Sequence, residues 1–288
     1  MAERSVFISK DAYPFFEEVP VRFDYFQGFA LSQRRKSQIS LHENFLDAYP
    51  ERKVLEISSA SLYSLGAALS ALCLKKRTQA GITTVESAFQ SSRIYGENGE
   101  IGPFPELLFY PPRECKKLVV ERSCGLPNRR FLYEGRAFYV PAHRPSLFFD
   151  YLYLNALCEE ENKEIADRLL NGGYSAFSDL ATKSLNNQAR SCAIFVSLVK
   201  NGRIDEVRTV DSYLRLVRTT ADGQPTGQES YEGVQLPDAK GWIHPALPAV
   251  PRKFTRGYIE QLYQAFCGHL TNRKTADNFL DLTPPAEE

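Results

Sequence analysis

The chain has 288 residues, of which 43% are hydrophobic, and its 35 basic residues balance its 35 acidic ones. This apolar content is enough for one core with an appendage, and zero net charge excludes a protein that coats nucleic acid through its overall field. Six cysteines form no CxxC pair and four histidines have no ligand spacing. The sequence therefore predicts no metal site, no disulfide framework and no cofactor.

The N-terminal segment 1–20 carries charges throughout and lacks the apolar run of a signal peptide. No stretch of 18 apolar residues occurs in the sequence. We therefore expect a reduced, cytoplasmic protein without a membrane contact.

Helical patterns dominate the first part of the chain. We predict helices over 36–48 and 61–72, a strand over 53–58, and a further helix that starts near Thr84, just after a break at Gly81. The middle of the chain predicts a small sheet, with a hairpin over 131–140 that turns at Glu134-Gly135.

The third part of the chain returns to helical patterns. We predict helices over 146–158, 160–170 and 188–200, the last of them stopped by Asn201-Gly202 in the manner of a left-handed cap. Residues 219–240 are polar and lack helical or strand periodicity, and 253–270 has the pattern of one more amphipathic helix. The expected organisation is a predominantly helical α+β domain over 1–216, a linker over 217–252, and a C-terminal helix and tail over 253–288.

The segment 83–95 has the most informative pattern. On a continuous helix, Glu86, Gln90 and Arg93 would share one face, so that a carboxylate, an amide and a cation converge. An alternative is that Thr83 and Glu86 form a capping box, in which the Glu side chain only reaches back to the backbone amide of the N-cap residue. Both interpretations remain open on spacing alone.

This segment resembles the central motif of the NADAR (YbiA-like) superfamily, whose best-known form reads roughly SEHYFQAQKF where residues 86–92 here read ESAFQSS. The chain is more closely similar to the NADAR antitoxins that are paired with DarT-type DNA ADP-ribosyltransferase toxins. Further similarities occur in the same order along 22–216, at residues 27–33, 54–59, 69–72, 150–157 and 187–190.

The resemblance implies a NADAR-like single domain that binds ADP-ribose and removes it from guanine bases in single-stranded DNA by hydrolysis of an N-glycosidic bond. Such a protein would be the antitoxin of a DarT-like toxin. Two alternatives stay open: a non-catalytic antitoxin that binds ADP-ribose, or binds the toxin through a surface such as 253–270, and an N-glycosidase of riboflavin-pathway intermediates.

Cleavage of a C1′–N bond builds positive charge at C1′, so a nearby carboxylate stabilises the transition state or activates water, while a second group helps the base to leave. Glu86 and Asp179 are the candidate carboxylates. Asp179 follows Gly172-Gly173, and the superfamily has an aspartate-containing loop there. The alternative for Asp179 is a capping or Asx-turn residue.

The ADP-ribose diphosphate needs cations or helix N-termini, and Arg190 with Asn187 near the start of a helix would meet that need. The alternative for Arg190 is a solvated helix residue. Phe89 or Tyr25 would stack on a base, although a core position is the more common fate of Phe. Further expected ADP-ribose contacts are Gly28, Ser70 and Gln90, although a serine near a helix end is often a capping residue.

Arg93 departs from the family pattern, which usually has lysine at this point. A lysine there can attack the ribose as an amine, whereas the guanidinium of Arg93 stays protonated and only holds a phosphate or hydroxyl. Lys75 or Lys76 would then have to supply an amine. Leu72 and Cys73 also stand where relatives commonly have Phe and Asn.

Three short basic runs could flank a groove for single-stranded DNA, with Tyr25 and Phe26 available for base stacking. Charge runs of this length are usually solvated surface. The runs are 34–36, 75–77 and 128–130 with its Arg129-Arg130 pair.

Overall fold

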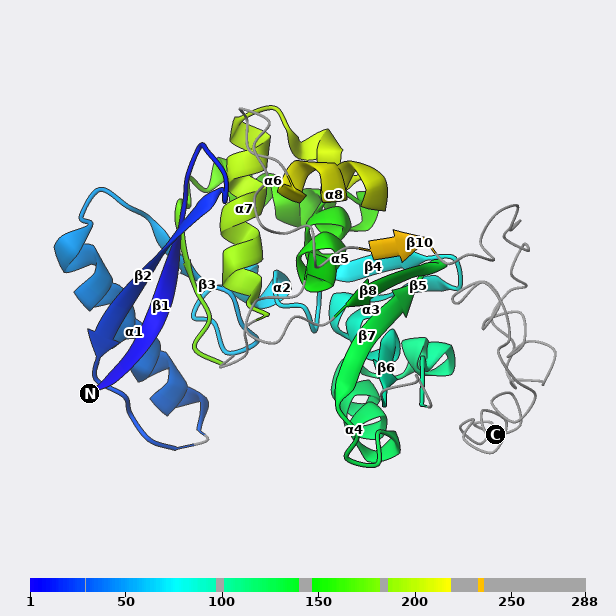
Figure 1. The fold of residues 1–288 in the computed structure, drawn as a ribbon. Helices are drawn as coiled ribbons and strands as arrows, with labels where there is room; N and C mark the ends of the chain where they lie inside the picture. The colour runs from blue at the N-terminus through cyan, green and yellow to red at the C-terminus, as the bar shows by residue number, and fades with distance from the viewer. Residues whose placement is uncertain (29, 97–100, 140–146, 182–185, 219–232, 236–288) are drawn as a thin grey trace. The chain divides into compact units, whose positions relative to one another are not determined.

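The computed structural model describes residues 1–28, 30–96, 101–139, 147–181, 186–218 and 233–235. They form two compact units (Figure 1). The first unit lies within Met1–Lys75 and His143–Ser230, and the second within Lys76–Ala142 and Tyr231–Glu288. Small sheets and helices make up both, so the predicted α+β class is confirmed for the described residues.

The first unit is built on a four-stranded mixed sheet of order β2-β1-β9-β3. β1 (Ala2–Ser9) pairs antiparallel with β2 (Phe16–Phe23) and with β9 (Ala176–Ser178), which pairs parallel with β3 (Val54–Glu56). The strand predicted over 53–58 is thus confirmed in a shorter form. No element was predicted for the segments that form β1 and β2.

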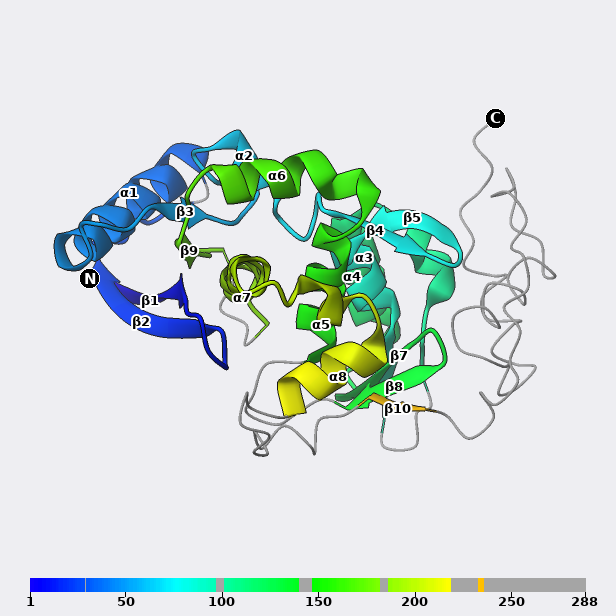
Figure 2. The ribbon, with the colours of Figure 1, turned by 90° about the horizontal axis from the view of Figure 1, so that it is seen from above.

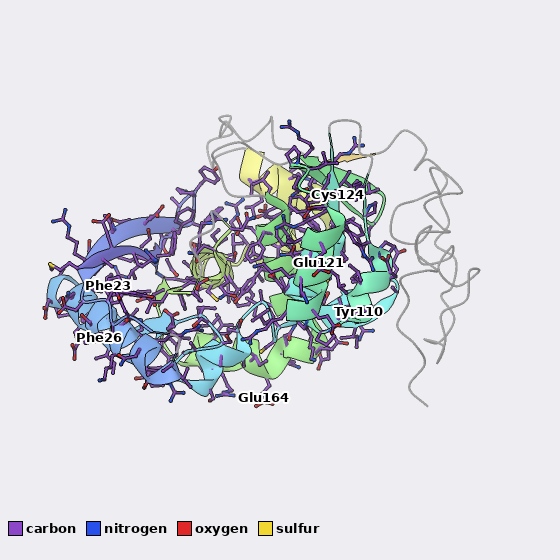
Figure 3. The ribbon with its side chains drawn as sticks, turned by 90° about the horizontal axis from the view of Figure 1, so that it is seen from below. Phe23, Phe26, Tyr110, Glu121, Cys124 and Glu164 are labelled. Carbon is purple, nitrogen blue, oxygen red and sulfur yellow. The ribbon has the colours of Figure 1, made fainter. Side chains whose placement is uncertain are left out.

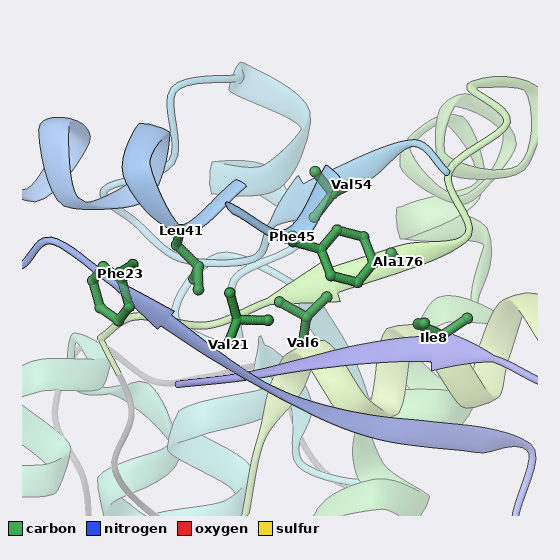
Figure 4. Close-up of a cluster of buried hydrophobic side chains, with 8 residues drawn as sticks. All are labelled: Val6, Ile8, Val21, Phe23, Leu41, Phe45, Val54 and Ala176. Atoms are coloured by element: carbon green, nitrogen blue, oxygen red, sulfur yellow. The ribbon is translucent and has the colours of Figure 1, made fainter. Parts of the chain in front are cut away.

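Helix α1 (Leu31–Ala48) covers one face of this sheet. Leu41 and Phe45 lie against a buried cluster of strand residues (Figure 4), which comprises Val6, Ile8, Val21, Phe23, Val54 and Ala176. Val6 and Ile8 alternate with Ser9, whose hydroxyl donates to the Ala193 carbonyl of α7 (Gln188–Lys200) at 2.9 Å. Because alternate residues of a strand point to opposite faces, α7 covers the other face.

The other helices of the first unit pack around α7. Figure 2 looks down α7, which lies between the β1–β2 hairpin and α5 (Leu147–Leu157). Helix α5 is buried nearly all round, as its sequence predicts. The remaining elements are α2 (Ser64–Ala68), η2 (Glu160–Asn162), α6 (Lys163–Asn171), η3 (Ile204–Val207) and α8 (Val210–Arg218).

The end of α7 has the predicted left-handed cap. Gly202 has φ of +67°, its amide donates to the carbonyl of Val199, and the Arg203 amide donates to that of Leu198. These two bonds satisfy carbonyls that the helix leaves open. The prediction of both the helix and its stop is confirmed.

The second unit contains a four-stranded sheet of order β10-β8-β7-β6 and a separate β4-β5 pair. Its elements are β4 (Lys75–Thr78), β5 (Gly81–Thr84), α3 (Val85–Ser91), β6 (Arg93–Tyr95), η1 (Pro105–Phe109), α4 (Pro112–Arg122), β7 (Asn128–Tyr133), β8 (Arg136–Tyr139) and β10 (Gly233–Gln235). Strands β7 and β8 form the predicted hairpin. Its turn residues Glu134 and Gly135 have φ of +48° and +74°, which a tight hairpin turn favours.

Other predicted elements differ from the structure. Only Ser64–Ala68 of the predicted helix 61–72 is α-helical, so Ser70 lies beyond the helix end. The segment between β6 and the β7–β8 hairpin contains helix α4, where the sequence predicted no helix. The polar segment 219–240, predicted to lack regular structure, contributes strand β10. Residues 253–288, with the predicted helix 253–270, lie outside the described residues.

None of the helices that the structure describes is long and apolar enough to cross a membrane. Five cysteines in the described part of the chain are free, namely Cys73, Cys115, Cys124, Cys158 and Cys192.

Candidate active site

Helix α3 carries the central motif and begins one residue later than a Thr83 capping box requires. Thr84 is the N-cap, and its hydroxyl oxygen accepts the Ser87 amide at 3.1 Å. The Thr83 hydroxyl instead donates to the carbonyl of Leu108. The alternative of a Thr83–Glu86 capping box is therefore wrong, and the Glu86 side chain is not used to cap the helix.

Glu86 is hydrogen-bonded to Gln90, which lies four residues further along the same helix. The Gln90 Nε2 donates to Glu86 Oε1 at 2.9 Å, and Gln90 is almost completely buried. The ammonium of Lys116 lies 3.8 Å from the same oxygen, on a side chain that is 62% exposed. Among the described residues, no hydrogen bond reaches Glu86 Oε2, so that oxygen can accept a further donor.

Arg93 does not continue the helical face. Helix α3 ends at Ser91, and Arg93 is the first residue of β6. Two backbone bonds end the helix here: the Phe104 amide donates to the Ser91 carbonyl at 2.6 Å, and the Leu132 amide to the Ser92 carbonyl at 2.8 Å. The predicted one-face arrangement of Glu86, Gln90 and Arg93 on a helix is therefore wrong in its last member.

The guanidinium of Arg93 lies over two aromatic rings, 5.0 Å from the centre of Phe89 and 5.8 Å from that of Phe131. These two rings are themselves 4.8 Å apart, and Phe89 is 4% exposed. The core position that the sequence allowed for Phe89 agrees with this burial. Arg93 Nε is also buried and has no hydrogen-bond partner among the described residues.

Asp179 lies in the first unit, directly after β9, and is buried. Its Oδ1 accepts the amide of Ala181 at 3.0 Å, which is the Asx-turn contact expected as the alternative for this residue. Asn187 is the N-cap of α7, where its Oδ1 accepts the amides of Ala189 and Arg190. The side-chain oxygen of Asn187 is thus used inside the protein.

Arg190 is buried in an ion pair. Its Nη2 lies 2.7 Å from Asp150 Oδ2, and the Ser191 hydroxyl donates to Asp150 Oδ1 at 2.6 Å. The alternative of a solvated helix residue is therefore wrong. The guanidinium already has an anionic partner, and no local pattern in the sequence predicts that Asp150 is that partner.

The remaining predicted contacts are spread over the first unit. Ser70 is 2% exposed and its hydroxyl accepts the Leu72 amide, so it acts in a turn. Gly28 precedes α1 with φ of +128°, a conformation that disfavours other residues. Of the two lysines considered as substitute amines, Lys75 is exposed, whereas Lys76 is buried and donates to the Arg77 carbonyl.

A buried chain of three polar side chains in the first unit was missed. The Ser178 hydroxyl donates to Glu56 Oε2 at 2.5 Å and lies 2.8 Å from His42 Nε2. Burial raises the pKa of Glu56 and lowers the pKa of His42 to about 4, because removal from water disfavours the charged form of each group. No local sequence pattern joins these residues, because they come from α1, β3 and β9.

The predicted residues thus fall into two sets. The second unit brings together Glu86, Phe89, Gln90 and Arg93, while Gly28, Ser70, Asp179, Asn187 and Arg190 belong to the first unit. In the part of the chain that the structure describes, no group of three His, Cys, Asp or Glu side chains could hold a metal ion.

The fold and this geometry define an α+β protein in which a short helix presents a carboxylate held by an amide. The chain belongs to the family of DarT1-associated NADAR antitoxins, whose model matches residues 2–226. A comparison with curated proteins found no match.

Proposed function

We propose that this protein is an ADP-ribosyl glycohydrolase that removes ADP-ribose from guanine bases in single-stranded DNA and so reverses the action of a DarT-like toxin. Membership of the antitoxin family supports the biological role. The proposed enzymatic activity rests on the geometry of Glu86. Its Oε1 accepts a hydrogen bond from Gln90, while its Oε2 has no hydrogen bond among the described residues.

This geometry suits hydrolysis of a C1′–N bond. In our proposal a water molecule donates a hydrogen bond to Glu86 Oε2 and attacks C1′ while the bond to the base nitrogen breaks. The electron pair of that bond goes to the base nitrogen, and the proton of the water goes first to the Glu86 carboxylate and then to that nitrogen, which regenerates the carboxylate. General acid–base catalysis of this kind contributes about 10²–10⁴-fold to a rate.

Gln90 has a positioning role in this scheme. Its side chain is buried and its Nε2 donates at 2.9 Å to the Oε1 of Glu86, so the carboxylate is oriented without being neutralised. Arg93 would hold a phosphate or hydroxyl through its guanidinium, since it has no amine that can attack the ribose.

The test is release of free ADP-ribose from a single-stranded oligonucleotide that carries ADP-ribosyl-guanine. Glu86→Gln should reduce turnover by about 10²–10⁴-fold and retain binding of the oligonucleotide. Glu114→Gln, at an exposed position in the first turn of α4, is the matched control and should leave turnover unchanged. Normal turnover by Glu86→Gln would overturn the proposed role.

A non-catalytic antitoxin is the second candidate, and the position of Arg93 favours it. The guanidinium stands over Phe89 and Phe131 where the family usually provides a lysine. Under this alternative the wild type binds the modified oligonucleotide without releasing ADP-ribose, and Arg93→Lys gains turnover. Turnover by the wild type would exclude it.

A further inference from the structure

A cavity of about 450 Å³ lies within the first unit, among residues of β1, α1, β3 and the segments that follow β2 and β9. This volume falls in the range of small-ligand sites. Its lining combines two cations with an aromatic side chain and a buried amide, namely Arg4, Arg34, Tyr25 and Gln38, with Ser37, Glu56, Ser58, Ala60, Leu180 and Ala181 completing the wall. We refer to it as the Gln38 cavity.

The amide of Gln38 is the informative group. The residue is 1% exposed, and its Oε1 accepts the Leu62 amide at 3.1 Å, which fixes the orientation of the side chain. Its Nε2 is buried and has no hydrogen-bond partner among the described residues. An amide donor left in this way costs free energy unless something in the cavity accepts from it.

The cations of the cavity also have donors to offer. Arg4 donates through Nη1 to the carbonyl of Glu3, while its buried Nε has no hydrogen-bond partner among the described residues. Arg34 is exposed, and within the described part of the chain no ion pair engages it. The carboxyl group of Glu56 also lines the cavity, and its two oxygens already accept from the Ser178 hydroxyl and the Leu180 amide.

Tyr25 is held at the cavity by the start of α1. The amides of Asp24 and Phe26, on either side of Tyr25, donate to the hydroxyls of Ser40 and Ser37 at 3.0 and 2.9 Å. The Tyr25 ring is nevertheless 53% exposed. Figure 3 shows the neighbouring Phe23 and Phe26 on the α1 side of this unit. The result is an anchored aromatic surface beside Arg34.

A second cavity of the same unit provides a comparison. It measures about 440 Å³ and includes Arg52, Lys53, Tyr63 and Tyr174 in its lining. Here the cations are already engaged: Arg52 pairs with Glu51 at 3.0 Å, and Lys53 donates to the Gly172 carbonyl and stands over the Tyr174 ring. Of these two linings, that of the Gln38 cavity contains buried donors with no hydrogen-bond partner among the described residues, namely Gln38 Nε2 and Arg4 Nε.

We propose that the Gln38 cavity binds an unmodified nucleotide of a single-stranded DNA, with its phosphate on Arg4 and Arg34, its base against Tyr25 and a keto oxygen of the base on Gln38 Nε2. Since the Leu62 amide occupies Gln38 Oε1, Nε2 is the group that Gln38 offers, and it requires an acceptor on the edge of the base that meets it, here taken as the edge with position 4 of a pyrimidine. Thymine O4 fits this requirement, whereas cytosine presents an amino group at the same position. The inference extends the proposed function, because the strand that carries the ADP-ribose would supply this nucleotide.

The experiment measures binding of fluorescein-labelled oligo-dT and oligo-dC of about 12 residues to the full chain by fluorescence anisotropy. Neither probe carries ADP-ribose, so the result does not depend on glycohydrolase activity. The wild type should prefer oligo-dT. Gln38→Glu keeps an acceptor for the Leu62 amide but replaces the open donor, so the preference should fall or reverse.

Two further variants test the aromatic and ionic contacts. Tyr25→Ala should weaken oligo-dT binding by about 5- to 100-fold, because stacking on an aromatic residue contributes that much per base. Arg34→Ala should lower the slope of log affinity against log salt concentration by about 0.7, the effect of one lost phosphate contact on a single strand. The matched controls are Tyr63→Ala, at a ring that is 54% exposed, and Arg52→Ala, both in the second cavity.

Equal effects of the Tyr25 and Tyr63 variants, or an unchanged dT preference in Gln38→Glu, would overturn the proposal. So would displacement of oligo-dT by free ADP-ribose together with weaker ADP-ribose binding in Tyr25→Ala, since the cavity would then hold the ADP-ribose itself. Failure of the proposed glycohydrolase activity would leave the oligo-dT result unaffected, so the two proposals fail separately.

Discussion

The buried carboxylate Asp150 of the first unit has both oxygens occupied, by Arg190 and by the Ser191 hydroxyl, whereas Glu86 of the second unit has one oxygen without a hydrogen bond among the described residues. Both residues stand in segments with a family resemblance, and both are mostly removed from water. The comparison teaches that a family resemblance alone does not distinguish a carboxylate that is already fully paired from one with an oxygen left to accept a further donor. The separation depends on whether the protein already satisfies the group.

The largest effect on stability is expected at the buried ion pair between Asp150 and Arg190. Arg190→Met leaves Asp150 buried without its cation and should lower the free energy of unfolding by about 3–5 kcal/mol, measured by urea denaturation. The double variant Asp150→Leu, Arg190→Met removes both charges and should recover a large part of that loss. A stable Arg190→Met protein that has lost only ADP-ribose binding would restore the diphosphate role predicted from sequence.

A second prediction compares buried titratable groups of the two units. Burial holds the pKa of His42 at about 4, below its usual 6.5, so the unfolded chain binds the extra proton and stability falls as pH drops from 6.5 to 4. In the second unit, burial raises the pKa of Glu106 from 4.5 to about 7 against the opposing effect of Arg122, so stability falls as pH rises through that window. Each shift corresponds to about 3 kcal/mol at its limit.

These opposite slopes should partly cancel in the wild type. Between about pH 4.5 and 6.5, His42→Gln should expose the Glu106 effect and become less stable as pH rises, while Glu106→Gln should become more stable over the same range. Urea denaturation at several pH values measures both. Parallel pH profiles for the two variants would contradict the assignment.

Gly66 tests close packing in the first unit. A Cβ at this position of α2 would lie 2.0 Å from the Glu56 carbonyl oxygen and 2.4 Å from the Ser61 hydroxyl. Gly66→Ala should therefore destabilise the protein by about 1–3 kcal/mol, although alanine normally favours a helix. Ser64→Ala, at an exposed position of the same helix, should change the free energy of unfolding by less than about 0.5 kcal/mol. A stabilised Gly66→Ala protein would show that α2 moves away from β3.

The smallest effect on stability is expected at Glu86, whose Oε2 has no hydrogen bond among the described residues. Glu86→Gln keeps an oxygen that can accept from Gln90, so the free energy of unfolding should change by less than about 1 kcal/mol even where turnover is lost. Thermal and urea denaturation of this variant check the expectation. A loss as large as that of Arg190→Met would place Glu86 with the structural carboxylates and remove the contrast between the units.

Part of the candidate site could be predicted from sequence because its geometry is local. Glu86 and Gln90 are four residues apart, and this spacing on a helix brings their side chains into contact. The same spacing argument was wrong for Arg93, because the helix ends before it, where the amides of Phe104 and Leu132 donate to the last carbonyls. Those partners lie 13 and 40 positions along the chain from the residues they bind, Ser91 and Ser92, and no local pattern reveals them.

The sequence by itself determined the features that short-range chemistry controls: the hairpin at Glu134-Gly135, helix α7 with its glycine cap, the apolar helix α5, and the resemblance that identifies the family. Tertiary structure alone decided that Asp150 pairs with Arg190, that Ser178 joins Glu56 to His42, and that Gln38 Nε2 is buried without a partner among the described residues. The physical reason is that turns and caps depend on neighbouring dihedral angles, whereas the satisfaction of a buried polar group depends on which distant segments pack against it.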